Sequence, residues 1–148
     1  EDGEDLYATR AVLEGRAARF AAERITGAEC AELARLHREM VRCVTPRDLG
    51  RYRELNRQFH TLIFRVSRRS HLVRTLMQRW AACPTMLWST IPRVAAAAVP
   101  GRDQPDEVEH AEIVAAMQAH DPDRAERALR VHVEAAATAL LAAMENGA

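Results

Sequence analysis

The sequence predicts an all-α fold, an antiparallel bundle of about six helices, and three observations predict it. Apolar residues recur at three- and four-residue steps along nearly the whole chain, which is the period of an amphipathic helix. The composition favours helix over sheet, because 28 of the 148 residues are alanine and 21 are arginine, whereas aromatic residues make up only 5%. Short stretches of capping and helix-breaking residues separate the periodic runs.

These runs and the residues between them define the expected helices. Thr26 and Glu29 form a predicted capping box, in which each side chain satisfies a free amide at a helix start. Pro84 is expected to kink the fourth helix, because proline lacks an amide donor and clashes with the preceding turn. Residues 99–104 form the one clear loop. The helices are expected at residues 5–25, 27–44, 46–66, 71–91, 105–120 and 122–145.

Composition and charge exclude several classes of function. The 21 basic and 21 acidic residues cancel, whereas a module that binds nucleic acid by itself usually has a basic excess. No stretch approaches the ~18 apolar residues of a membrane span, and the start does not resemble a signal peptide. Three widely spaced cysteines without a Cys-x-x-Cys pair indicate reduced thiols and a cytoplasmic location. We therefore expect one cytoplasmic domain that contacts neither membrane nor DNA directly.

Three histidines lie on the apolar faces of three different expected helices. Asn56 and His60 are four residues apart and share one helix face, and His110 and His132 align with the apolar stripes of the last two helices. Buried polar groups need partners, and imidazole nitrogens with an amide oxygen are suitable ligands for a divalent metal ion. The sequence therefore predicts a metal site. The alternative is that each histidine is a core residue bonded to a backbone carbonyl or an acid.

Other polar residues near these positions favour simpler interpretations. His37 also lies beside an apolar stripe, whereas His71 and His120 lie near helix ends and are expected to face water or a helix dipole. Glu109 and Glu112 flank His110, but their helical phase is poor for reaching the same cavity.

Four segments of the chain carry a family resemblance. Three of these segments contain the histidines, and the separations of 50 residues from His60 to His110 and 22 from His110 to His132 fit the pattern of the same family. The chain resembles, over essentially its whole length, the FadR C-terminal (FCD) domain, which is the effector-sensing and dimerising half of GntR-family bacterial transcriptional regulators. Six expected helices are similar to the shorter, VanR-like form. The segments are residues 5–22 (DLYATRAVLEGRAARFAA), 55–60 (LNRQFH), 109–113 (EHAEI) and 130–133 (RVHV).

The resemblance implies a ligand set and a partner. A divalent metal ion, zinc or nickel, would be held by Asn56, His60, His110 and His132, and a small carboxylate effector would bind beside it. Arg10 of the first helix would help to hold that effector, since a guanidinium can bind a carboxylate through two hydrogen bonds. The alternative for Arg10 is a surface ion pair with Glu14, four residues on. The resemblance also implies a homodimer, with residues 86–91 and 135–143 as candidate faces.

The sequence departs from the family pattern in three places. Asn56 stands where aspartate is common, which removes a negative charge from the metal site. Arg68, Arg69 and Ser70 replace a Gly-Asn-Pro turn. The winged-helix DNA-binding domain that normally precedes this domain is absent from the sequence, so DNA is expected to be bound only through that missing domain.

Together these observations predict a ligand-sensing domain of a transcriptional regulator and not an enzyme. One alternative is a metal-dependent hydrolase, because three histidines around a metal with open positions can activate water. The sequence shows no well-placed acid or base to support it. The other alternative is a plain dimerising bundle with core histidines and no ligand.

Overall fold

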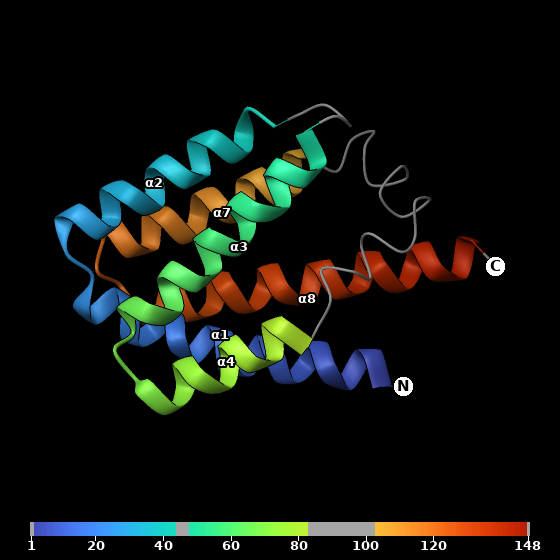
Figure 1. Cartoon of the computed structure of the whole chain (residues 1–148), viewed down its shortest axis with the longest axis horizontal. Coiled ribbons are helices and arrows are strands. Elements are labelled where there is room, and N and C mark those ends of the chain that lie inside the picture. The colour runs from blue at the N-terminus through green and yellow to red at the C-terminus, as the bar shows by residue number, and fades with distance from the viewer. Residues whose placement is uncertain (1, 44–47, 83–102, 148) are drawn as a thin grey trace.

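The computed structural model of the chain describes residues 2–43, 48–82 and 103–147. Within these ranges the chain forms six helices and no strand (Figure 1), which confirms the predicted all-α class. None of these helices is long and apolar enough to span a lipid bilayer. The helices are α1 (Asp2–Arg24), α2 (Gly27–Val41), α3 (Leu49–Val66), α4 (Ser70–Ala82), α7 (Asp103–Gln118) and α8 (Pro122–Gly147).

The two longest helices form the spine of the bundle. α1 and α8 pack along each other over much of their length, and their outer ends, which carry the N- and C-termini, lie at the same end of the molecule (Figure 1). α7 packs on α8, α2 packs on α3 and α7, and α4 lies against α1 and α3. α3, α7 and α8, the helices with the predicted metal ligands, all contact α1.

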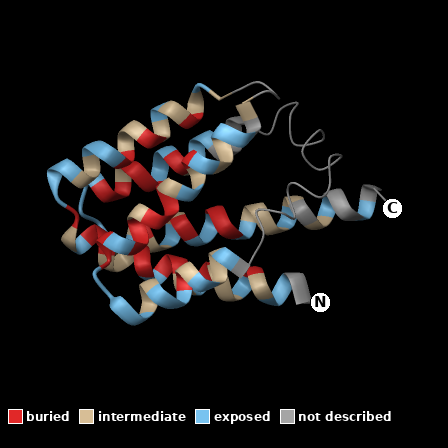
Figure 2. Ribbon diagram, in the orientation of Figure 1, coloured by how far each residue is buried: buried red, intermediate tan, exposed pale blue. Residues whose placement is uncertain are grey.

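The described helices bury an apolar core that consists of one large cluster and two smaller ones. Buried positions face inward on each helix and solvent-exposed positions face outward (Figure 2), as the three- and four-residue spacing predicts. The largest fully buried apolar side chains are Phe59, Phe64, Leu33, Leu36, Ile63, Leu76, Ile113, Met117 and Leu129. The described part of the chain buries six polar side chains among them: Glu14, His60, Thr61, Ser67, His110 and His132.

Two of the predicted helix starts are confirmed by their hydrogen bonds. Thr26 Oγ1 accepts from the backbone N–H of Glu29 at 3.2 Å, and the Glu29 carboxylate accepts from the backbone N–H of Thr26 at 2.9 Å. At the start of α8, Asp121 Oδ1 accepts from the backbone N–H of Arg124 at 3.1 Å, and Pro122 takes the first helical position, where its missing N–H is not needed.

Several predicted boundaries differ from the structure. α2 ends at Val41 instead of continuing to residue 44, and α4 begins at Ser70, one residue early. α7 begins at Asp103, inside the predicted loop. Pro105 thus falls in the first turn of α7, where proline is tolerated because the first four N–H groups have no helical partner. The predicted kink at Pro84, the candidate dimer segment 86–91 and most of the loop lie outside the described residues.

The turn between α3 and α4 places an arginine in a left-handed backbone conformation. Arg68 has φ = 52°. It stands at the position where the family that the sequence resembles has glycine. Side-chain contacts hold it there: Arg68 donates to the carbonyl oxygen of Val66 at 3.0 Å and to the Glu29 carboxylate at 2.8 Å. Glycine would adopt this φ without steric cost, so the contacts of Arg68 offset backbone strain that the family pattern avoids.

Candidate metal centre

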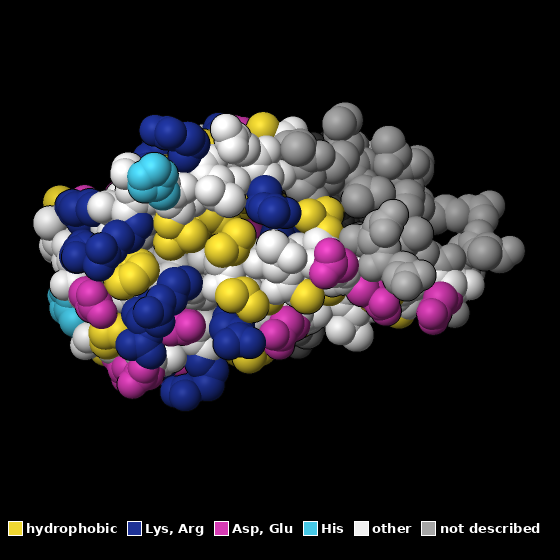
Figure 3. Space-filling model, turned by 90° about the horizontal axis from the view of Figure 1, so that it is seen from below, with side chains coloured by type: hydrophobic (Ala, Val, Ile, Leu, Met, Phe, Trp, Pro, Cys, Tyr) yellow, Lys and Arg dark blue, Asp and Glu magenta, His cyan; other side chains and the backbone are white. Residues whose placement is uncertain are grey.

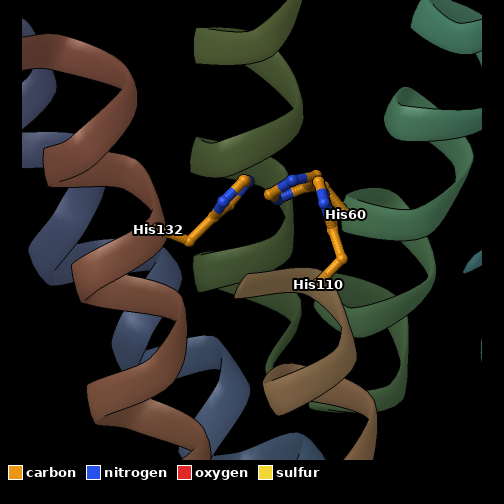
Figure 4. Close-up of side chains that lie close together, drawn as sticks. All are labelled: His60, His110 and His132. Atoms are coloured by element: carbon orange, nitrogen blue, oxygen red, sulfur yellow. The ribbon is translucent and has the colours of Figure 1, made fainter. Parts of the chain in front are cut away.

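Three imidazoles from three helices meet inside the bundle. His60 on α3, His110 on α7 and His132 on α8 are 1%, 1% and 6% exposed. Each offers one ring nitrogen, and these atoms all lie within 4.8 Å of one another. The rings of His110 and His132 are 4.3 Å apart between centroids, and those of His60 and His132 are 5.3 Å apart. Figure 4 shows the three rings pointing toward one another.

Local sequence explains why these polar rings face inward. His60 follows buried Phe59 and precedes buried Ile63, so the apolar face of α3 carries the imidazole into the core. His110 and His132 lie one helical turn from buried Ile113 and Leu129 in the same way. Burial of the apolar stripes therefore drives the three imidazoles together.

Asn56 joins the cluster through His110. Its side-chain oxygen Oδ1 lies 3.1 Å from Nε2 of His110, and Asn56 itself lies one turn before His60 on the same face of α3. The structure thus brings together the four residues predicted as ligands. Their donor atoms are three imidazole nitrogens and one amide oxygen.

A buried carboxylate on α1 lies behind His60. Glu14 is 0% exposed, and its Oε2 lies 3.3 Å from Nδ1 of His60. Its Oε1 accepts hydrogen bonds from Arg10 Nε at 2.8 Å and from Trp80 Nε1 at 2.9 Å. Burial raises the pKa of Glu14, but His60 and the positive charge of Arg10 outweigh it and lower that pKa to about 2. Glu14 is therefore an anion inside the bundle.

A second carboxylate lies behind His132. Oε2 of Glu109 on α7 lies 2.7 Å from Nδ1 of His132 on α8, so the expectation that the helical phase of Glu109 keeps it from the site is wrong. That expectation considered His110 on the same helix, whereas the close packing of α7 on α8 brings Glu109 to a histidine of the neighbouring helix. Glu112 behaves as expected, because it forms an exposed ion pair with Arg124 at 2.6 Å.

These carboxylates set which ring nitrogen can bind a metal. A neutral imidazole that donates its Nδ1–H to a carboxylate carries its lone pair on Nε2. Burial lowers the pKa of His60, and the contact with Glu14 offsets only part of that effect, so His60 is neutral near pH 7. Metal ligation requires neutral imidazoles, and a carboxylate behind each ring is the usual outer-shell arrangement of metal-binding histidines.

Arg10 lies beside this centre but is not a surface residue. The predicted contact with Glu14 is present, yet Glu14 is fully buried and the Arg10 side chain is only 13% exposed. The guanidinium carbon lies 4.9 Å from the ring centroid of Tyr7 and 5.1 Å from that of Trp80. Trp80 also contacts His60, with ring centroids 5.0 Å apart. Arg10 and His60 thus share two neighbours, Glu14 and Trp80.

The remaining histidines lie outside the cluster. His37 is half-buried and stacks on His110 with ring centroids 6.5 Å apart; its Nε2 is buried without a hydrogen-bond partner in the described part of the chain. His71 is exposed. His120 is exposed as well, and its ring nitrogen Nδ1 lies 3.0 Å from the carbonyl oxygen of Ala22, which agrees with its expected place at a helix end.

Glu14, Trp80 and Glu109 were not predicted as parts of the site. Glu14 carries the clearest sequence signal, because Tyr7, Ala11, Glu14 and Ala18 follow one another at steps of four, three and four residues, and all four are buried. A carboxylate inside such an apolar stripe needs a buried partner. Its spacing from Arg10 is also that of an ordinary surface ion pair, which is the alternative that the sequence leaves open for Arg10.

Comparison with known proteins identifies the domain. The family model described as the FCD domain matches residues 5–135. The chain belongs to the FCD domain family. The FCD domain occurs in GntR-family transcriptional regulators, where it is a regulatory and not a catalytic domain. The matched residues include every member of the histidine cluster and both carboxylates behind it.

The fold of this FCD domain also occurs in solved structures. It is similar to E. coli McbR/YncC with a TM-score of 0.79 and 20% sequence identity, over 93% of this chain and 67% of that chain. At this identity the likeness shows the fold alone. No curated protein matches the chain in sequence.

This FCD domain also has a basic hollow on its surface, and the hollow is separate from the histidine cluster. Figure 3, seen from the side of α4, shows arginine side chains gathered toward one end of the molecule. An open hollow at the α3–α4 turn shares no lining residue with the histidine cluster or with Arg10, so it is distinct from the candidate metal centre. It is lined by Arg65, Arg68, Arg69, Ser70, Val73 and Arg74.

Proposed function

We propose that this FCD domain senses a small carboxylate at a divalent metal ion bound by Asn56, His60, His110 and His132. The observation that carries the proposal is the set of three buried imidazoles, whose nitrogens lie within 4.8 Å of one another. Two of these rings also have a carboxylate at Nδ1. A core histidine that serves only packing has no reason to direct a ring nitrogen toward the ring nitrogens of two other histidines.

The donor set suits zinc or nickel. Imidazole nitrogens with one oxygen ligand are favourable for both ions. With metal–nitrogen distances of about 2.1 Å, ligands of one tetrahedral ion lie about 3.4 Å apart. The observed upper limit of 4.8 Å is about 1.4 Å wider than this tetrahedral spacing, so we expect the rings to move together when the ion binds.

The neutral ligands favour an anionic effector. Because Asn56 replaces the common aspartate, all four proposed ligands are uncharged, and the two positive charges of the ion are not compensated by any of them. Glu14 and Glu109 are not proposed ligands. Each contacts the Nδ1 atom of a ligand histidine, so it offsets the charge of the ion only from the far side of the ring. A carboxylate that enters an open coordination position would supply the missing negative charge at short range.

Arg10 is proposed to bind the other oxygen of that carboxylate, or a second acidic group of the same effector. Its Nε is held by Glu14 and its guanidinium is close to two aromatic rings, so the side chain is pre-organised. A guanidinium fixed in this way binds a planar carboxylate with little further loss of conformational entropy.

The sensor is proposed to act on DNA through a winged-helix domain attached to the same protein and through a homodimer. The effector must bind one arrangement of the dimer more tightly than another, because equal affinity would shift no equilibrium. The difference would respace two DNA-binding domains relative to paired half-sites in the major groove. The alanine-rich residues 135–143 of α8 are the proposed dimer face.

A thermal-shift screen tests the proposal. Small mono-, di- and tricarboxylates, with the corresponding amides as uncharged controls, are added to protein with zinc or nickel and to protein with chelator. An effector at 100 times its Kd adds about 2.7 kcal/mol to the free energy of unfolding. We expect a carboxylate to raise Tm only when metal is present, and the shift to be lost in Arg10→Met but not in Arg74→Met. Equal shifts with chelator would contradict metal-assisted sensing.

A further inference from the structure

Glu14 is held in place from two helices. Its Oε1 accepts one hydrogen bond from Arg10, one turn earlier on α1, and another from the indole N–H of Trp80 on α4. The side chain is completely buried. With one oxygen fixed by two donors, the direction of the second oxygen is fixed as well.

The second oxygen faces His60. Oε2 of Glu14 and Nδ1 of His60 lie 3.3 Å apart, and neither atom has an aligned hydrogen-bond partner in the described part of the chain. A buried acceptor without a donor is unfavourable, because it has lost its hydrogen bonds to water and gained none in the protein. The arrangement therefore favours the His60 tautomer that has its proton on Nδ1, where a small ring movement completes the hydrogen bond.

We infer that Glu14 is a positioning residue that keeps the proton of His60 on Nδ1, so that Nε2 presents its lone pair to the centre between His110 and His132. This inference rests on the proposed metal site, which it deepens. Arg10 and Trp80 act on the metal ligand indirectly, because they hold the carboxylate that orients it. The proposed effector arginine and the metal ligand His60 are thus joined through a single side chain.

The substitution Glu14→Gln tests this role with almost no change in shape. The carbonyl oxygen of glutamine can still accept from Arg10 and Trp80, but its NH₂ group then faces His60 and donates. His60 must accept at Nδ1 and carry its proton on Nε2, where a protonated nitrogen cannot bind a metal. Loss of such an outer partner typically lowers metal affinity by about 10–100-fold, and we expect a decrease in this range.

Two measurements follow on the full chain. Competition with a chromogenic chelator gives the Kd for zinc and for nickel, and long-range ¹H–¹⁵N NMR of the metal-free protein gives the tautomer of His60. We expect Nδ1–H in the wild type and Nε2–H in Glu14→Gln. Glu126→Gln is the control, because Glu126 is likewise a carboxylate that pairs with an arginine of α1, Arg19, but contacts no histidine; the substitution should change neither quantity.

The outcomes separate this inference from the proposed function. If the wild type binds metal but Glu14→Gln binds it equally well with His60 still protonated on Nδ1, the role of Glu14 is wrong and the metal site stands. If the wild type binds no metal, the proposed function is wrong, and the tautomer of the metal-free protein still decides the role of Glu14. An Nε2–H tautomer in the wild type would overturn the inference even if the variant failed to fold.

Discussion

His132 and Glu109 form the second of the two imidazole–carboxylate contacts and the shorter one. The 2.7 Å distance between His132 Nδ1 and Glu109 Oε2 is that of a charge-assisted hydrogen bond. The contact fixes the ring orientation and leaves the Nε2 lone pair for a metal ion. Unlike Glu14, Glu109 is 22% exposed on its side chain, so its replacement should perturb the fold little.

Glu109→Gln is predicted to lower metal affinity by about 10–100-fold. Glutamine is uncharged, so it replaces the charge-assisted hydrogen bond to Nδ1–H of His132 by a weaker one and makes the Nε2 lone pair a poorer metal ligand. Chelator competition measures the affinity. Glu112→Gln, three residues on in the same helix, removes an exposed carboxylate that pairs with surface Arg124 and should leave the affinity unchanged. Equal effects of the two substitutions would contradict a specific role for Glu109.

The contact between α1 and α8 is the most extensive one between two described helices. Gly15 lies at this crossing, and a Cβ built there would lie 2.4 Å from Cγ of Arg130 and 3.2 Å from the backbone oxygen of Glu126. The first distance is far below van der Waals contact, and Cγ of arginine is too near its own backbone to move away freely. The crossing therefore needs a residue without a side chain.

Gly15→Ala is predicted to destabilise the domain. Overpacking typically costs about 1–3 kcal/mol, which exceeds the gain of roughly 0.5–1 kcal/mol when alanine replaces glycine in a helix. Urea unfolding measures the change. Gly50→Ala in α3 is the control, because nothing lies within 4 Å of its added Cβ, and its free energy of unfolding should be unchanged or slightly raised. Equal stability of the two variants would show that the helices separate easily at Gly15.

The α3–α4 turn is predicted to distinguish glycine from alanine at position 68. Both Arg68→Gly and Arg68→Ala lose the exposed ion pair with Glu29, which contributes at most about 1 kcal/mol. Only glycine relieves the left-handed φ of 52°, a conformation that costs other residues roughly 1–2 kcal/mol. Arg68→Gly should therefore unfold at a higher urea concentration than Arg68→Ala. The reverse order would mean that the turn relaxes to another conformation.

At the scale of the whole molecule, the proposed metal ion would connect three helices. His60, His110 and His132 come from α3, α7 and α8, so a bound ion ties together segments that are far apart in the sequence. Since these ligands come together only in the folded chain, binding energy is also folding energy. Stability should thus depend on metal across the entire bundle.

Metal removal is predicted to lower Tm of the whole domain in one cooperative transition. Free zinc or nickel at 100 times its Kd should add about 2.7 kcal/mol to the free energy of unfolding. Calorimetry with and without chelator measures this, and magnesium, which prefers oxygen ligands, serves as the control ion. The same Tm with zinc, magnesium and chelator would contradict a metal that links the helices.

The fold and the histidine cluster could be predicted because their signals are local. Apolar spacing places His60, His110 and His132 on the inner faces of their helices. The capping residues Thr26 and Asp121 each accept a hydrogen bond from a residue three positions later, so a helix start is a local signal. Such patterns need no knowledge of how helices pack on one another.

The outer carboxylates could not be predicted in this way. Glu14 reaches His60 only because α1 packs on α3, and Glu109 reaches His132 only because α7 packs on α8. Trp80 reaches Glu14 and His60 only because α4 packs against both α1 and α3. The rotation of each helix about its axis, and not its periodicity, decides these contacts, and a single sequence carries little information on that rotation.

The most direct test of the account is the metal content of the chain, purified without a histidine tag and measured by plasma mass spectrometry. After loading with zinc or nickel and gel filtration, the wild type and the exposed-histidine control His71→Ala should each retain about one ion per chain. His60→Ala and His132→Ala, which each remove a proposed ligand, should retain close to none while remaining folded. One ion per chain in all four proteins, or in none, would contradict a metal centre at the histidine cluster.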